Sequence, residues 1–277
     1  MSDLHNYSGS WVPWRLADVA PAGLIDGANP NVSTQTIAIP ERGLTSVSFQ
    51  IAYAQIHNRS GGAANVGLGV RLPLAAWKAG QWTHGTTTYT DDTTDFQSAA
   101  TTDAALETTT ANSGFVVQSF YPFSAIEIDV GTSSAGTGPV RILEYSVAGG
   151  SWTTLTNPVI HSNSGSHYAA GTNSLIWWVP PADWAPIEGG HGTNLTVGMY
   201  GVRVRSTTPP GTTAGVADSI SVHRIYWSME GLADNAIYEV PLGGMYAPFD
   251  VPANALVAAF SVANPQNRAT VLYRHRG

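Results

Sequence analysis

The sequence contains no cysteine, which excludes disulfide bridges and thiolate metal sites. The fold must therefore depend on the burial of apolar side chains. Charge is also scarce: charged residues make up 11% of the chain, against roughly 25% in ordinary soluble domains. Lysine occurs once, at Lys78. A weakly charged surface gives little protection against association. This composition suits a protein that works packed against partners, and a secreted Thr-rich β-protein would share it.

Basic residues are too few for a nucleic-acid protein. The net charge is −7 and the isoelectric point about 5.5, whereas counterion release on nucleic acid needs clustered Lys and Arg. The basic cluster near the C-terminus is interpreted as a solvated or docking tail (Arg268, Arg274 and Arg276). No apolar run reaches the roughly 18 residues that a membrane helix needs. The start, MSDLHNYSGSWVPWRL, lacks the pattern of a signal peptide. We expect no nucleic acid and no membrane among the partners.

Catalytic motifs are missing as well. The sequence has no HExxH, GxSxG, GxGxxG or Walker motif, and its histidines lie mostly in loops. Three carboxylates on expected strands, Glu127, Asp129 and Glu144, are the candidates for the acid pair of a glycosidase. Alternation places them on the outer side of a half-solvated sheet, which disfavours catalysis. We therefore expect a protein without enzymatic activity.

One acidic run is a candidate metal site. Asp91, Asp92 and Asp95 form the motif DDTTD, and carboxylate and Thr oxygens at short spacing can bind Ca²⁺. The run lacks the glycine and the terminal glutamate of an EF-hand loop. A solvated acidic loop within a long exposed segment, 83–114, is the favoured interpretation. The prediction is therefore no cofactor and no metal, with Ca²⁺ as the alternative.

Alternating apolar and polar residues dominate residues 115–206. Ile126, Ile128 and Val130 share one face, and Val202 and Val204 repeat the pattern further along. A period of two is typical of half-buried antiparallel strands, and Gly/Ser/Thr clusters separate the strands. The sequence predicts an all-β fold, an antiparallel β-sandwich or jelly roll with long irregular loops.

The flanking segments extend this organisation. We expect an irregular docking arm at 1–43 and a β-sandwich module at 115–230. Between them, 44–114 should provide strands and a long Thr/Asp-rich loop that pack with a C-terminal β-hairpin or docking segment at 231–277. The strand at 44–56 is expected to pair with 66–72 as a hairpin, and 72–80 to form a helical turn. The sequence leaves open whether the flanks complete the sandwich or form a second, smaller β subdomain.

Aromatic side chains supply the candidate binding residues. Exposed aromatic rings stack on sugars and anchor protein interfaces. Trp177 and Trp178 are adjacent on a strand and face opposite sides, so one should be core and the other covered by a loop, a partner or a ligand. Exposed, coplanar rings around 152, 168 and 184 would indicate glycan binding. The candidates for ligand or partner binding are Trp11, Trp14, Trp178, Trp184 and Tyr168.

Several runs resemble a known family. FSAIEIDVG, EYSVAGGSWTTLT, IWWVPPADWAPI and YGVRVR resemble a β-sandwich module of tailed-bacteriophage virion proteins, and WKAGQWTHGTTTYTDDTTDF upstream is similar to runs in phage structural proteins. Together the runs cover 77–206. The resemblance implies a virion component made in the host cytoplasm: a head-decoration, fibre, spike-base, tail or baseplate protein.

Such a component would bind other capsid or tail subunits. We expect it to form a homo-oligomer, with a trimer favoured. The alternative is a carbohydrate- or receptor-binding β-sandwich module used in host attachment, with a surface glycan as its partner. A fold alone cannot decide between the two, because β-sandwiches host both roles.

Overall fold

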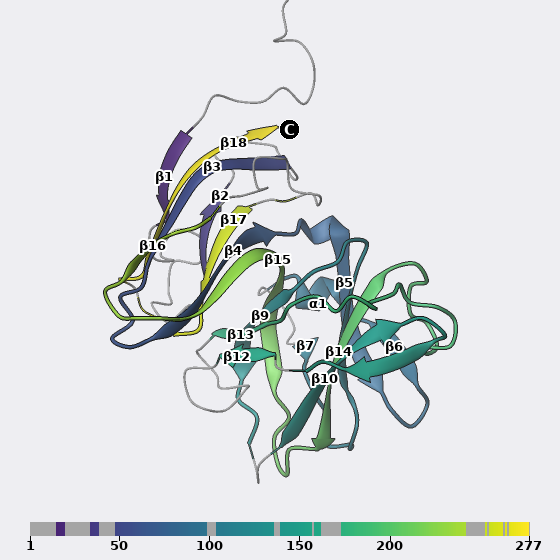
Figure 1. Ribbon diagram of the computed structural model, residues 1–277. Coiled ribbons are helices and arrows are strands. Elements are labelled where there is room, and N and C mark those ends of the chain that lie inside the picture. The colour runs from purple at the N-terminus through teal and green to yellow at the C-terminus, as the bar shows by residue number, and fades with distance from the viewer. Residues whose placement is uncertain are drawn as a thin grey trace, which may run out of the picture. The chain divides into compact units, whose positions relative to one another are not determined.

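The computed structural model describes residues 15–19, 34–38, 48–98, 104–135, 139–156, 158–161, 173–241, 253, 255–262, 264 and 266–276. Within these ranges the fold is nearly all β and its paired strands are antiparallel, as predicted (Figure 1). Among the described residues the helical elements are the turn η2 (Leu74–Ala76) and the short helix α1 (Thr93–Phe96). No helix in the described part of the chain is long and apolar enough to cross a membrane. The chain divides into two compact units, unit 1 (1–73 and 223–277) and unit 2 (74–222).

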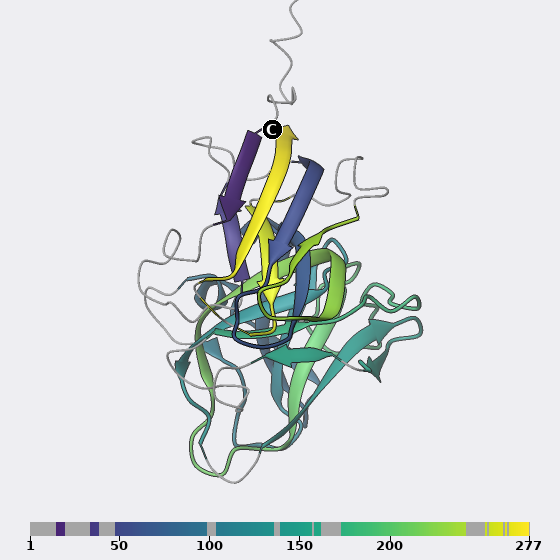
Figure 2. The same cartoon turned by 60° about the vertical axis from the view of Figure 1, so that its left-hand side comes forward.

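Unit 1 is built from strands of both ends of the chain. Its four-stranded sheet has the order β1 (Arg15–Val19), β18 (Arg268–Arg276), β3 (Ser48–His57) and β16 (Ile237–Glu239). In Figure 2 the purple β1, yellow β18 and blue β3 lie side by side. A second group places β4 (Ala64–Arg71) between β15 (Val216–Leu232) and β17 (Ala255–Phe260), with β2 (Thr34–Ala38) beyond.

The expected hairpins of unit 1 are wrong in their pairing, although the strands themselves are present. β3 pairs with β18 and β16, whereas β4, which follows β3 along the chain, pairs with β15 and β17. β17 and β18 are likewise consecutive and lie in different sheets. A strand buries its apolar face equally well whether the next strand along the chain pairs with it or joins another sheet. Alternation therefore does not predict which of the two arrangements forms. At the β3–β4 turn, the buried Asn58 side chain donates to the carbonyls of Gly62 and Leu232, at 2.8 and 2.7 Å.

Unit 2 contains a six-stranded sheet. Its order is β11 (Ser151–Thr154), β10 (Val140–Val147), β14 (Tyr200–Thr208), β8 (Gly114–Ser119), β5 (Trp77–Thr83) and β6 (Thr88–Asp91). The other strands among the described residues of the unit are β12 (Val159–His161), β13 (Asn173–Trp177), β9 (Ala125–Thr132), β7 (Ala104–Ala105) and the start of β15. Ile126, Ile128 and Val130 are buried on β9, in agreement with the predicted alternation.

The unit boundaries differ from those expected for the sandwich module. Unit 2 begins at Leu74 because β5 pairs with β8 and β6 pairs with β5, so 74–114 belongs with the module. The expected long exposed segment at 83–114 is therefore wrong in large part, since Tyr89, Phe96 and Leu106 are buried. Residues 48–57 pair with the C-terminal strand β18.

Candidate functional site

The register of the six-stranded sheet places a set of polar and aromatic side chains on one face. Val116 on β8 lies opposite Gly80 on β5 and Arg203 on β14, and Arg203 lies opposite Glu144 on β10. Because side chains alternate along a strand, the residues two positions away share this face. We call it the outer face of the sheet. Its further members are Lys78, Trp82, Gln118, Ile142, Ser146, Trp152, Thr154 and Arg205.

Two arginines converge on one carboxylate at the centre of the outer face. Oε2 of Glu144 accepts from Nε of Arg203 at 2.6 Å and from Nε of Arg205 at 2.7 Å, and Oε1 accepts from Nη2 of Arg205 at 3.1 Å. Nη1 of Arg205 also donates to Oδ1 of Asn112. Such charge-assisted bonds are the strong class of hydrogen bond. Both carboxylate oxygens of Glu144 therefore accept hydrogen bonds from the two arginines.

The expectation that the strand-borne glutamates face solvent is wrong. Glu144 and Glu127 are both buried, and Asp129 is half-buried. Arg203 and Arg205 lie against Glu144, and the segment 185–199 covers another part of the same face. Ile187 and Leu195 of this segment pack with Trp82, Tyr89 and Val116 in one buried cluster. A long connection therefore turns a face that alternation marks as exposed into a covered one.

Arg203 lies in the angle between two indoles. Its Cζ is 5.0 Å from the ring centroid of Trp82 and 4.7 Å from that of Trp152, and the two rings meet edge to face at 62°. Cation–π contacts of this kind hold a guanidinium in a defined orientation. Trp152 is itself fixed, because its Nε1 donates to the carbonyl of His191 at 3.0 Å. Nδ1 of His191 accepts from the amide of Glu188 at 2.9 Å within the covering segment, and the His191 ring meets Trp152 edge to face.

The arginines keep Glu144 ionised. Burial alone would raise the pKa of Glu144, but the hydrogen bonds from Arg205 and Arg203 outweigh burial and hold the pKa below its ordinary value. A carboxyl group with a lowered folded-state pKa adds stability above its unfolded pKa, and this stability is lost as the pH falls through the folded pKa.

The urea midpoint of unfolding should therefore fall as the pH drops below about 5. Part of this acid dependence should come from Glu144, so the Glu144→Gln variant should show a weaker dependence between neutral and acid pH than the unmodified protein. The measurement is urea unfolding followed by tryptophan fluorescence at a series of pH values. Identical acid dependence in the two proteins would contradict the assignment of a lowered pKa to Glu144.

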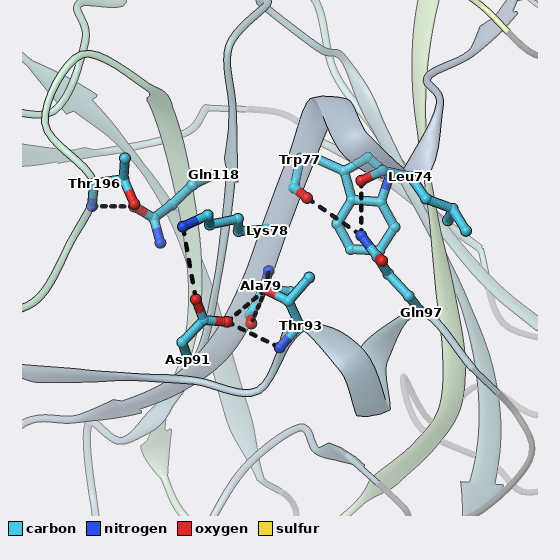
Figure 3. A network of polar contacts seen from close by, with 9 residues as sticks. All are labelled: Leu74, Trp77, Lys78, Ala79, Asp91, Thr93, Gln97, Gln118 and Thr196. Atoms are coloured by element: carbon cyan, nitrogen blue, oxygen red, sulfur yellow. Dashed lines mark hydrogen bonds and ion pairs between the residues drawn. The ribbon is translucent and has the colours of Figure 1, made fainter. Parts of the chain in front are cut away.

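The other end of the outer face holds the acidic run. Figure 3 shows Asp91 between Lys78 and Thr93. Oδ1 of Asp91 accepts from the amide and hydroxyl of Thr93, at 3.0 and 2.6 Å, and Oδ2 lies 3.8 Å from Nζ of Lys78. Nearby, Oε1 of Gln118 accepts from the amide of Thr196 at 2.7 Å. Asp91 thus fastens β6 to the start of α1.

The predicted Ca²⁺ alternative gains no support from this geometry. Burial and the neighbouring Asp95 raise the pKa of Asp92. Asp91 is engaged by Lys78 and Thr93. In the described ranges, no three His, Asp or Glu side chains are grouped so that they could hold a metal ion.

The predicted aromatic binding residues fall into two groups. Trp11, Trp14 and Tyr168 lie outside the described residues. Trp178 and Trp184 are 3% and 9% exposed and pack edge to face on Phe123, with centroids 5.6 and 5.2 Å away. Trp177 is buried too, so the chain itself covers both members of the pair. The exposed, coplanar rings that would indicate glycan binding around 152 and 184 are absent in the described residues, where Trp152 is half-buried and Trp184 is buried.

The arginine pair is the part of this site that sequence reasoning missed. Its signal was present, since Arg203 and Arg205 are two residues apart on a strand and therefore share a face. The comparisons do not place the site in a known context: no family model, no curated protein and no solved structure matches the chain.

Proposed function

We propose that the chain is a non-enzymatic structural protein of a tailed-bacteriophage virion. It would serve as a head-decoration, fibre, spike-base, tail or baseplate component. The observation that carries the proposal is the position of the phage-like runs in the fold. FSAIEIDVG falls on β9, EYSVAGGSWTTLT on β10 and β11, and YGVRVR on β14. The resemblance therefore lies in the strands that form the framework of unit 2.

The buried acids support a structural role. Glu107 and Glu144 have their carboxylates occupied by Arg141 and by the Arg203–Arg205 pair. Hydrogen bonds from these arginines outweigh burial and lower the pKa of both glutamates. A general acid needs the opposite shift, towards neutral pH. These two residues are therefore poorly suited to proton transfer.

Exposed apolar side chains support assembly through subunit contacts. Phe120, Val179 and Val197 on unit 2 are 56%, 80% and 68% exposed, and Ile237 on unit 1 is also exposed. Together with the low charge content, such surface favours association. We propose a homo-oligomer, a trimer first, that docks on neighbouring capsid or tail subunits.

Light scattering on the purified chain at several concentrations tests this proposal. We expect the mass of a trimer or of a larger closed ring. Peptides of the chain should also appear in mass spectra of particles purified from the source of the gene. A monomer at every concentration would count against self-assembly, and absence of the chain from those particles would count against a virion role.

Val179→Asp and Val197→Asp should shift the oligomer towards monomer. Each places a charge at a position that is already exposed, so the melting temperature should stay within about 2 °C of the original. Light scattering and thermal unfolding of each variant give both readouts. Ala182→Asp is a matched control, since this exposed position carries little apolar surface. Unchanged mass in both valine variants would show that these side chains lie outside the interface.

A second candidate function is a carbohydrate- or receptor-binding module. It is favoured by Trp227 and Tyr238 in unit 1, which are half-buried and stack with their planes 14° apart and centroids at 5.6 Å. Parallel rings with exposed parts can support a sugar. A glycan array should then show binding that Trp227→Ala abolishes and Trp227→Phe retains in part. An array without signal would argue against this function.

A further inference from the structure

We propose that the corner formed by Trp82, Glu144, Trp152, Arg203 and Arg205 binds the carboxylate of an acidic sugar. We call this group the Arg203 corner. The proposal is independent of a virion role, and in naming a sugar it rests on the second candidate function. The argument has three steps: unused hydrogen-bond donors, a fixed orientation and a neighbouring surface that fits a pyranose ring.

The first step concerns charge and donors. Two guanidinium groups share one carboxylate, so the Arg203 corner carries one uncompensated positive charge. Arg205 uses Nε, Nη1 and Nη2 in hydrogen bonds to Glu144 and Asn112. Arg203 uses Nε alone, and among the described residues neither of its Nη groups has a hydrogen-bond partner. With 12% of its side-chain surface exposed, Arg203 can still be reached by a small ligand.

The Nη groups of Arg203 can donate hydrogen bonds to a ligand. A carboxylate that accepts from both Nη groups would replace solvent there with two parallel, charge-assisted bonds. A neutral sugar hydroxyl would satisfy the donors less well and would leave the charge uncompensated. The net charge of −7 gives the whole chain no general attraction for anions. Selectivity must therefore come from this local arrangement.

The second step concerns orientation. The contacts of Arg203 with Trp82 and Trp152, together with its bond to Glu144, fix the guanidinium before any ligand arrives. Trp152 is held in turn by the carbonyl of His191. An arginine whose side chain is already ordered loses little conformational entropy on binding, which strengthens its interaction with a ligand.

The third step concerns the neighbouring surface. Trp152 is half-buried, and its ring lies 4.7 Å from the Arg203 guanidinium. Thr154, two residues along β11, lies opposite Glu144 on the same face and is exposed. An apolar ring surface next to a hydroxyl and a cation suits a pyranose that bears a carboxylate. A bare carboxylate would use the arginine but neither Trp152 nor Thr154.

Two-dimensional NMR titration of the purified full chain tests the proposal. The probes are sodium glucuronate, glucose and sodium acetate, and the main signal is the indole N–H of Trp152. We expect saturable shifts with glucuronate and affinity at least about tenfold weaker for glucose and acetate. Equal binding of acetate would overturn the sugar assignment. Equal binding of glucose would overturn the role of Arg203 while leaving the second candidate function intact.

Variants separate the site from a general loss of structure. Arg203→Lys keeps the charge beside Glu144 but loses the planar fork, and should weaken glucuronate binding about tenfold. Thr154→Val sits on an exposed edge strand and should weaken it without altering the circular dichroism spectrum. Arg59→Gln removes an equal charge at an exposed position of unit 1 and should change nothing. Unchanged binding in both Arg203→Lys and Thr154→Val would overturn the proposal. If glucuronate fails but the glycan array is positive, the Arg203 corner is excluded and the second candidate function survives.

Discussion

Replacing Glu107 by glutamine should reduce the free energy of unfolding by about 3–5 kcal/mol. The Glu107 carboxylate is buried and accepts from Nε and Nη2 of Arg141, at 2.9 and 2.7 Å. It also accepts from the Ser206 hydroxyl at 2.6 Å and the Gly215 amide at 3.2 Å. A glutamine amide cannot accept all of these bonds, and it removes the carboxylate charge that lies against the buried guanidinium of Arg141. The large effect comes from losing a buried ion pair together with its hydrogen bonds.

Urea unfolding followed by tryptophan fluorescence measures the loss. The matched control is Asp91→Asn, which removes the charge 3.8 Å from Lys78 in a pair that is about half exposed, and keeps an oxygen that can accept from Thr93. That variant should cost well under about 1 kcal/mol, because exposed pairs are screened by solvent. If Glu107→Gln costs no more than Asp91→Asn, the Glu107–Arg141 pair contributes nothing beyond an ordinary surface contact.

Phe123→Ala should cost about 3–5 kcal/mol as well, for a different reason. Phe123 is fully buried and supports both Trp178 and Trp184 through edge-to-face contacts. Removing its ring leaves a cavity that neighbouring side chains can fill only in part. The near-ultraviolet circular dichroism of the tryptophans should weaken together with the stability.

Phe120 gives an internal control for that experiment. It lies three residues away and is 56% exposed, so Phe120→Ala should change stability by no more than about 0.5 kcal/mol. Comparing the two variants distinguishes the effect of losing a buried ring from the effect of losing an exposed aromatic residue. Similar costs for the two variants would show that the segment around 120–123 does not hold the core as described.

The strands were predictable because their signal is local. Ile126, Ile128 and Val130 alternate with acidic residues, and β9 runs through them. Pairing was not predictable in the same way. β3 and β4 are joined by a short turn with the glycines and asparagine of a hairpin, yet they pair with β18 and β15 instead. Which strand lies beside another depends on apolar faces far apart in the sequence, and alternation reports only that such a face exists.

The candidate site shows a similar limit. The spacing of Arg203 and Arg205 places both on one face of a strand, so their proximity could have been predicted. The burial of these two arginines could not have been predicted, because it depends on the segment 185–199. This segment approaches closely where side chains are missing: a Cβ on Gly201 would lie 2.8 Å from Cδ1 of Ile187. No periodic pattern in the segment or around Gly201 predicts this contact.

The division of the chain has a consequence for the order of events during synthesis. Unit 2 is contiguous, whereas unit 1 combines residues before 74 with residues after 222. On the ribosome, unit 2 can therefore finish folding while β3 and β4 still wait for β17 and β18. Until then the apolar faces of β3 and β4 have no permanent cover and are open to chaperones or to a second nascent chain. Because the strands that complete unit 1 are synthesised last, the folding of unit 1 is the step most open to misfolding.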